Sequence, residues 1–390
     1  MKILHQLGHN QKWGLDSYFQ NEIGDGFIFC AYNTDYDKFG SDISGYGPEK
    51  YMPLSMLDLQ YYGYKASNGL GSLDSYKFHP CHSSKKKNTL LPDPEVIREG
   101  INFQIKSGLK NIIIPNKYWD KKEADKSIQV INTLNDYVKK NRQDGIKYFM
   151  TVSFSDADIK DDVWVEKVLS CLTDMDKVFD GYYIVCGSYV EYKKKISIDF
   201  DYHTNILRIF STLNKQGFKT IYGYANWDAV LFYALTDIDG ITIGTYENLR
   251  KFDIRRFTEG MGGGPSKGWY FSEKLLNMIR SQDLIPLRKS GALDLIKNEK
   301  NIFSEVILDE NYVWDNGKPD VHKNYLLAIS KILKELSSYK DINKRANFLL
   351  GRVDEARKLY KKLHDKKITL LDESADYHLS AWYSFLSSKI

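Results

Sequence analysis

Three acidic residues stand at or just beyond the ends of segments that are predicted to be β-strands. Asp58 interrupts an otherwise apolar run over residues 56–59. A carboxylate there is costly unless it is paired or solvated, and partial burial raises its pKa toward the range that suits acid–base catalysis. Glu191 and Glu247 each follow a predicted strand end by a few residues. Because paired carboxylates cleave glycosidic bonds, Asp58, Glu191 and Glu247 are the predicted catalytic residues.

Small and polar residues follow the same predicted strand ends. Those that we predict to bind substrate are Asp156, Gly187, Ser188, Tyr224 and Asn226. If the strands are parallel, their carboxyl ends meet on one face, which is where barrel enzymes carry their sites.

A glycine-rich run over residues 262–268 precedes the last predicted strand. Glycines let backbone N–H groups approach an anion, so Gly263, Gly264 and Lys267 are the predicted phosphate-binding residues. The alternative is an ordinary solvent-exposed loop.

Basic runs occur at residues 85–87, 193–195 and 255–256, beyond predicted strand ends. If they lie on one rim of the barrel, they form a surface that binds a phosphate backbone; otherwise they are solvated charges on loops.

No metal or other cofactor is expected. The four cysteines are far apart, and none belongs to a C-x-x-C pair. His79, Cys81 and His82 form the one close group of potential zinc ligands, but further ligands at the usual spacing are missing. The simplest interpretation is a protein with reduced thiols.

The elements that must position these residues alternate between short apolar segments and amphipathic helices. Eight strands are predicted, at residues 26–32, 53–59, 111–115, 145–152, 180–187, 219–224, 240–244 and 268–271. Strands joined by helices pair in parallel, and apolar runs indicate burial on both faces. The pattern predicts a (β/α)8 TIM barrel, with an open doubly wound sheet as the alternative. The first predicted strand lacks the G-x-G-x-x-G turn of dinucleotide-binding folds.

The 390 residues fit a barrel over 1–285 and a helical C-terminal extension over 286–390. The extension has apolar residues at helical spacing over 320–365, so it packs on the barrel, binds a protein partner or presents a solvated face.

The net charge of +4 neither requires nor excludes a nucleic-acid partner. No apolar run is long enough for a signal peptide or membrane helix, so a cytoplasmic location is expected.

Parts of the chain resemble the tRNA-guanine transglycosylases. Residues 179–191 are similar to the strand and loop that line that family's base pocket, and residues 222–228 with 237–239 look like its next strand and helix. Residues 56–58 are similar to the strand that carries the family's base-contacting aspartate. The resemblance covers about half of the barrel and implies a pocket for a base or nucleoside formed by Asp58 and the Gly187-Ser188 turn.

The chain departs from this family at two places. The family's nucleophilic aspartate is replaced by Thr242 or has no counterpart, and 244–246 read Gly-Thr-Tyr where the family has Pro-Thr-Arg. The family's cysteine-and-histidine zinc site has no counterpart here. Covalent base exchange at this position is therefore in doubt.

Three functions follow from these patterns. The first is a diverged transglycosylase-like barrel that binds a nucleobase, nucleotide or nucleic-acid segment and cleaves or exchanges an N-glycosidic bond. The second is a glycoside-hydrolase-like barrel that uses Glu191 and Glu247, with the aromatic residues Tyr61, Tyr62, Trp119 and Trp227 stacking on sugars. The third is an inactive barrel that serves as a subunit of a larger assembly. The position of the Asp58 carboxylate relative to the two glutamates discriminates between an enzyme and a scaffold.

Overall fold

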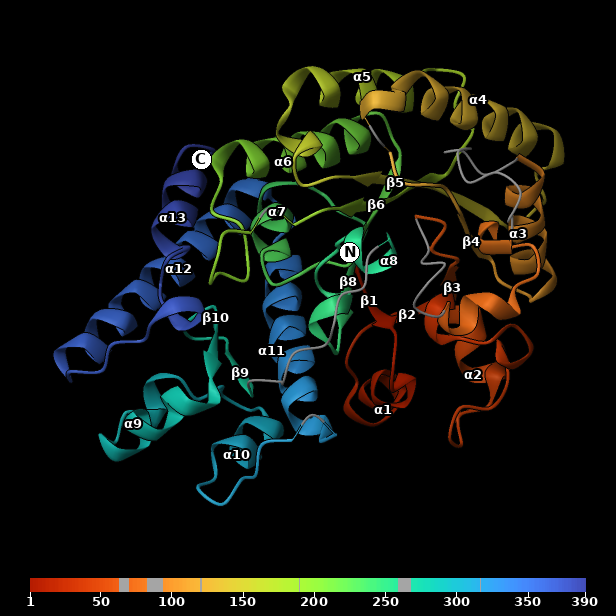
Figure 1. Ribbon diagram of the computed structural model, residues 1–390. Helices are drawn as coiled ribbons and strands as arrows, with labels where there is room; N and C mark the ends of the chain where they lie inside the picture. The colour runs from red at the N-terminus through yellow and green to blue at the C-terminus, as the bar shows by residue number, and fades with distance from the viewer. Residues whose placement is uncertain (63–69, 83–93, 120, 189, 259–267, 316) are drawn as a thin grey trace.

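The computed structural model describes residues 1–62, 70–82, 94–119, 121–188, 190–258, 268–315 and 317–390. Eight parallel strands form one sheet in the order β3-β2-β1-β8-β7-β6-β5-β4. They are β1 (Lys2–Leu7), β2 (Gly26–Cys30), β3 (Ser55–Asp58), β4 (Asn111–Ile114), β5 (Lys147–Phe154), β6 (Gly181–Cys186), β7 (Lys219–Gly223) and β8 (Gly240–Gly244). Strands β3 and β4, at the two ends of this order, lie side by side without a ladder of hydrogen bonds. The fold is therefore a nearly closed (β/α)8 TIM barrel, as predicted (Figure 1).

The set of eight strands differs from the prediction at both ends. The barrel begins with β1, which pairs with β2 on one side and with β8 on the other. The prediction missed this strand because His5 and Gln6 interrupt its short apolar pattern. The predicted eighth strand, at 268–271, was wrong as a barrel strand. Strand β9 (Trp269–Ser272) instead forms an antiparallel hairpin with β10 (Asn277–Arg280) outside the barrel.

Helices follow most of the strands and cover the outside of the barrel. The larger ones are α1 (Gln11–Asn21), α3 (Pro94–Lys106), α4 (Ala124–Asn141), α5 (Asp162–Leu172), α6 (Phe200–Lys215) and α7 (Ala229–Leu235). The shorter ones are α2 (Pro48–Tyr51) and α8 (Arg255–Thr258). Aspartates start two of them: the Asp161 carboxylate accepts from the Trp164 N–H, and that of Asp199 from the Tyr202 N–H. These contacts satisfy backbone donors that an uncapped helix leaves free.

The alternation of side chains along each strand creates two apolar cores. On β6, Tyr183 and Val185 belong to a cluster inside the barrel, whereas Tyr182 and Ile184 belong to the larger core between barrel and helices. Residues inside the barrel include Leu4, Ile28, Met56, Ile113, Phe149, Tyr183, Val185 and Ile221. The barrel interior is thus filled by side chains.

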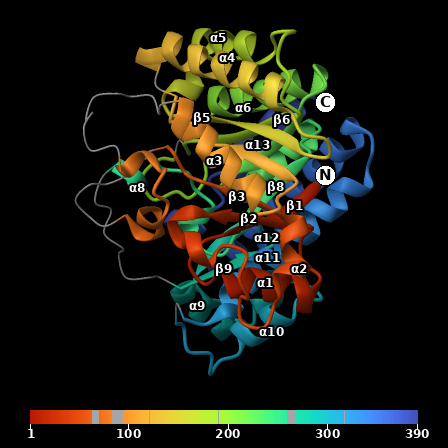
Figure 2. The same cartoon turned by 90° about the vertical axis from the view of Figure 1, so that its right-hand side faces the viewer.

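The C-terminal part is helical and packs on one side of the barrel. It contains α9 (Leu284–Lys289), α10 (Ile302–Leu308), α11 (Pro319–Ser338), α12 (Ile342–Asp365) and α13 (Leu379–Ser387). Helices α11 and α12 contact α7, and α11 also contacts β9 and α1. Helices α4 and α5 lie at one end of the molecule, and α9 and α10 lie at the other (Figure 1 and Figure 2). Within the described residues, no helix combines the length and apolarity that a membrane crossing requires.

Candidate functional site

Asp58 ends β3 and lies inside the carboxyl-terminal end of the barrel, where its side chain is surrounded by hydroxyl groups. The residue is only 2% exposed. The Gln60 N–H donates to Oδ1 over 2.9 Å. The hydroxyls of Tyr62, Tyr183 and Tyr224 lie 3.1, 3.2 and 3.4 Å from Oδ2. A carboxyl group is therefore held in a cage of tyrosines that come from three different parts of the chain.

Burial raises the pKa of Asp58 from 3.8 to about 6, against the opposing effect of its hydrogen-bond donors. Burial disfavours the charged carboxylate, and the hydrogen bonds from Gln60 and the tyrosines partly restore it. A carboxyl group with a pKa near 6 can both donate and accept a proton near neutral pH, which a surface aspartate does poorly.

The cage offers Asp58 more donors than one oxygen can use well. Three hydroxyls share Oδ2, and all three distances exceed the 2.7–2.8 Å that is usual for O–H···O bonds. A carboxylate oxygen has about two lone-pair directions. At least one tyrosine hydroxyl is therefore able to turn toward another acceptor without leaving Asp58 unpaired.

Further polar side chains link the cage to neighbouring strands. Gln60 Nε2 donates to the Tyr224 hydroxyl over 2.6 Å, and its Oε1 accepts from the Tyr32 N–H over 2.8 Å. Gln6, on β1, donates to Cys30 Sγ over 3.1 Å and lies 3.4 Å from the Tyr183 hydroxyl. We call Gln6, Cys30, Asp58, Gln60, Tyr62, Tyr183 and Tyr224 the Asp58 network.

Two residues of the Asp58 network have a strained backbone. Gln60 and Tyr224 both have left-handed backbone conformations, with φ of 55° and 53°. This conformation costs a residue with a side chain about 1–2 kcal/mol. Such strain persists where the surrounding structure enforces it, and it clusters at functional sites. Here it lets the two side chains meet beside Asp58.

The thiol of Cys30 is not activated as a nucleophile. Burial raises its pKa to about 12, and the Asp58 carboxylate adds to this effect. Since the thiolate is the reactive form, Cys30 is a hydrogen-bond acceptor for Gln6 rather than a catalytic thiol.

Two phenylalanines cover the Asp58 network from the segment that follows β8, residues 245–258, which we call the β8–α8 segment. The Phe252 ring centroid lies 5.1 Å from that of Tyr62 and 5.5 Å from that of Tyr224. Phe257 lies 5.8 Å from Tyr62. This aromatic cover is the reason why Asp58 has almost no exposure.

A cavity of about 120 Å³ adjoins this cover at the ends of β5 and β6. It brings together three of the predicted substrate-binding residues, Asp156, Gly187 and Ser188. Phe252 lines the same cavity and also contacts the tyrosine cage, so the cavity and the Asp58 network share this side chain. Glycine is required at 187, because a Cβ there would lie 2.5 Å from the Asp156 backbone nitrogen.

The other two predicted substrate-binding residues lie elsewhere. Tyr224 belongs to the Asp58 network. Asn226 precedes α7, where its Oδ1 accepts from the Trp227 N–H and its Nδ2 donates to the Lys195 carbonyl. The hydroxyl of Thr242, which aligns with the nucleophile of the transglycosylases, is buried and accepts from the Ala225 N–H.

The two predicted catalytic glutamates are paired with lysines. Glu191 forms an ion pair with Lys194, and Glu247 Oε2 lies 2.8 Å from Lys195 Nζ. Although burial opposes it, the Lys195 ammonium lowers the pKa of Glu247. None of the hydrogen bonds of Asp58 comes from Glu191 or Glu247.

The aromatic residues proposed to stack on sugars do not gather at the mouth of the barrel. Three of the four, Tyr61, Trp119 and Trp227, are buried in the core outside the barrel.

The predicted phosphate-binding residues Gly263, Gly264 and Lys267 lie outside the described residues. The His79-Cys81-His82 group is engaged with backbone carbonyls: His79 Nε2 lies 3.1 Å from the Leu59 oxygen, and His82 Nε2 lies 3.0 Å from that of Asp74. Across the described residues, no three histidine, cysteine or acidic side chains are grouped to hold a metal ion.

Sequence reasoning missed three members of the Asp58 network. Gln6 was overlooked together with β1, Tyr183 lies in mid-strand, and Cys30 appeared only as an isolated thiol. The available signal was the alternation of β6, which places Tyr183 on the same face as Val185.

No protein-family model and no curated protein sequence matches the chain. Among solved structures, a dihydrodipicolinate synthase from Oceanobacillus iheyensis is similar at 11% sequence identity and a TM-score of 0.30. The match covers 99% of this chain and 95% of that one. A likeness at this level carries no information about the reaction.

Proposed function

We propose that the chain is an enzyme that binds a nucleobase, as part of a nucleoside, nucleotide or nucleic-acid segment, at the carboxyl-terminal mouth of the barrel. In this proposal it cleaves the N-glycosidic bond, with Asp58 as the acid that protonates the departing base. The observation that carries the proposal is the buried Asp58 carboxyl, held by three tyrosine hydroxyls and with a pKa of about 6.

The chemistry of the surroundings suits a planar ring that carries hydrogen-bond donors and acceptors. Aromatic side chains stack on the faces of bases, and carboxyl and hydroxyl groups pair with their edges. Phe252, Tyr118, Asp156 and Ser188 supply both kinds of group at the neighbouring cavity. The resemblance to transglycosylases, which assigns base contact to the position of Asp58, agrees with this choice.

The same site favours hydrolysis over covalent base exchange. Exchange in the resembling family needs a carboxylate nucleophile where this chain has Thr242, whose hydroxyl is already used by the Ala225 N–H. In hydrolysis, the bond between the sugar carbon and the base nitrogen breaks as the base takes a proton from Asp58. Water then adds to the sugar carbon, and the proton that this water loses returns Asp58 to its acid form. Asp58 is almost fully buried, so substrate reaches it only if part of its aromatic cover, to which Phe252 belongs, moves.

The test is the release of free base from a panel of nucleosides, nucleotides and short single strands, followed by chromatography. We expect Asp58→Asn to lower turnover roughly 100-fold or more, because the amide cannot deliver a proton. Its melting temperature should not fall. Asp228→Asn is the matched control: Asp228 is also buried, has a pKa raised by burial to about 7, and starts α7.

Unchanged turnover in Asp58→Asn would contradict the assignment of Asp58. Equal losses in both variants would point to a general structural effect and would also count against it. If the intact protein neither releases a base nor shows saturable binding of any member of the panel, the proposed function is wrong.

A further inference from the structure

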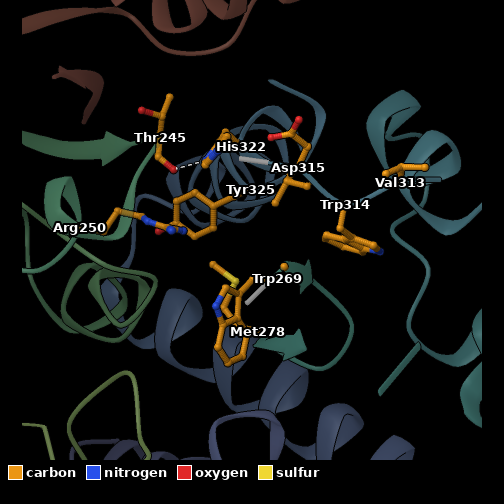
Figure 3. Close-up of a pocket in the computed structure, with 11 residues that line it drawn as sticks. Thr245, Arg250, Trp269, Met278, Val313, Trp314, Asp315, His322 and Tyr325 are labelled. Atoms are coloured by element: carbon orange, nitrogen blue, oxygen red, sulfur yellow. Dashed lines mark hydrogen bonds between the residues drawn. The ribbon is translucent and has the colours of Figure 1, made fainter. Parts of the chain in front are cut away.

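A second and larger cavity, of about 340 Å³, lies between the end of β8 and the C-terminal elements. Its walls come from the β8–α8 segment, the β9–β10 hairpin, the coil after α10, and α11. The lining residues used below are Thr245, Arg250, Trp269, Trp314, His322 and Tyr325 (Figure 3). This volume lies within the range of small-molecule sites.

Arg250 is the unusual residue of this cavity. It is 91% buried (9% exposed), and two of its guanidinium nitrogens, Nε and Nη1, have no hydrogen-bond partner among the described residues. The guanidinium lies beside the ring of Tyr325, 4.1 Å from its centroid (Figure 3). Buried charged donors are costly when unpaired, so an unpaired arginine on a cavity wall indicates a missing acceptor.

Among the described residues, no carboxylate forms an ion pair with Arg250. The Arg250 charge helps to lower the pKa of Glu247, but that carboxylate forms its ion pair with Lys195, at 2.8 Å. Asp315 lies across the cavity, away from Arg250, and its Oδ1 accepts from the Gly317 N–H (Figure 3). Burial raises the pKa of Asp228, which interacts with Tyr325, to about 7, so this group is only partly ionised near neutral pH.

The other walls are aromatic and firmly held. Trp314 packs directly on Gly268, where a Cβ would lie 2.3 Å from the indole. His322 Nδ1 lies 2.6 Å from the Thr245 carbonyl, and its ring stacks on Trp13 at 5.1 Å. Lys195 Nζ lies 4.0 Å from the Trp269 ring centroid. Rigid aromatic walls bind planar rings at low entropic cost.

We propose that this cavity binds a ring-bearing oxyanion, with Arg250 contacting the anion and Trp269 and Trp314 contacting the ring. A phosphate monoester and a carboxylate share the required chemistry, since both match the guanidinium donors. This site shares no residue with the Asp58 network. Ligand binding here requires neither catalysis at Asp58 nor any residue of the barrel interior, so the proposal goes beyond the proposed function.

The test is calorimetric titration of the full chain with phenyl phosphate, inorganic phosphate and benzoate at constant ionic strength. We expect saturable binding of phenyl phosphate or benzoate, or of both, tighter than that of inorganic phosphate. Binding of one aromatic probe alone identifies which oxyanion the site takes. Arg250→Gln should weaken binding roughly 10- to 100-fold, because it removes charged hydrogen bonds.

Control variants separate this site from general effects. Arg357 on α12 also lies over a tyrosine ring, 4.8 Å from that of Tyr383, but on an exposed surface, so Arg357→Gln should bind like the unmodified protein. Trp314→Ala should weaken the aromatic probes and leave inorganic phosphate unchanged. Asp58→Asn should bind normally, so failure of the proposed function would not affect this result.

The melting temperature without ligand gives an independent readout. Arg250→Gln removes a buried charge that has unsatisfied donors, so the melting temperature of this variant should equal or exceed that of the unmodified protein. The proposal is overturned if the full chain shows no saturable binding of any of the three probes. It is equally overturned if Arg250→Gln binds them with unchanged affinity. Should Arg250→Gln fail to fold, Arg250→Lys preserves the charge and is expected to retain part of the affinity.

Discussion

The side chain of Asp58 combines features that a purely structural residue rarely needs. It is buried, it faces three hydroxyls with one oxygen, and its two neighbours Gln60 and Tyr224 have strained backbones. An apolar residue could fill the same space without the cost of a buried carboxylate. This excess cost is the reason why we assign Asp58 a chemical role.

The raised pKa of Asp58 predicts a specific dependence of stability on pH. Its folded-state pKa of about 6 lies above the unfolded value of 3.8, so the folded state binds more protons between these two values. The contribution of Asp58 to the free energy of unfolding therefore falls as pH rises from about 4 to about 6. The shift corresponds to a change on the order of 3 kcal/mol.

Asp58→Asn cannot titrate and should remove this fall. The free energy of unfolding of the variant minus that of the unmodified protein should increase as pH rises through this window, as measured by urea unfolding at several pH values. A difference that stays constant across the window would contradict the raised pKa. The subtraction cancels titrations that both proteins share.

At the scale of elements, the β8–α8 segment stands between the two candidate sites. Thr245 and Arg250 line the larger cavity, while Phe252 lines the smaller one and covers the Asp58 network. One short segment thus contributes to both. Glu247, which was predicted to be catalytic, also lies in this segment and pairs with Lys195 rather than with any group of the Asp58 network.

Strand β1 is the element that closes the barrel, because it joins β2 to β8. We expect Leu4→Pro to destabilise the protein by about 3 kcal/mol or more, since proline removes a ladder donor within a central strand. Leu4→Met keeps the donor and the volume, so it should cost less than about 1.5 kcal/mol. Urea unfolding monitored by circular dichroism measures both. Equal stabilities would show that β1 is dispensable for the fold.

For the whole molecule, buried neutral histidines set the response to acid. Burial lowers the pKa of His5 and His203 to about 4, and that of His79 and His378 to about 3. These residues lie in separate parts of the chain, on β1, on α6, near η5 (Pro80–His82) and before α13. Protonating any of them therefore favours unfolding of the part that buries it.

The sign of this effect is opposite to that of Asp58. A histidine whose folded pKa lies below 6.5 contributes stability at neutral pH that is lost as pH falls from about 6.5 toward the folded value. Four such groups outweigh the two buried aspartates with raised pKa values, Asp58 and Asp228, so the free energy of unfolding should fall from about pH 6.5 to pH 4. His378→Gln should make the fall shallower, whereas His364→Gln, at an exposed position of α12, should not. A profile that is flat over this range would refute the expectation.

Much of the fold was predictable because it follows from local patterns. Apolar segments alternating with amphipathic helices indicate a barrel, and seven of its eight strands are visible in this way. Strand β1 is the exception, because its polar residues are buried by hydrogen bonds to distant partners. His5 contacts the Ile23 carbonyl before β2, and Gln6 contacts Cys30 on β2. The segment that forms β9 was correctly predicted to be a strand, but its sequence does not show that it pairs with β10 instead of joining the barrel.

The sequence by itself predicted that the chain forms a barrel and that an aspartate interrupts the strand at residues 53–59. It also placed Asp156, Gly187 and Ser188 at strand ends, where they line one cavity. Only the tertiary structure decided what each charge faces. Three tyrosines from distant segments meet Asp58, and lysines pair with Glu191 and Glu247. Two guanidinium nitrogens of Arg250 have no hydrogen-bond partner among the described residues. Burial and ion pairing depend on residues far apart in the chain, and local spacing does not encode them.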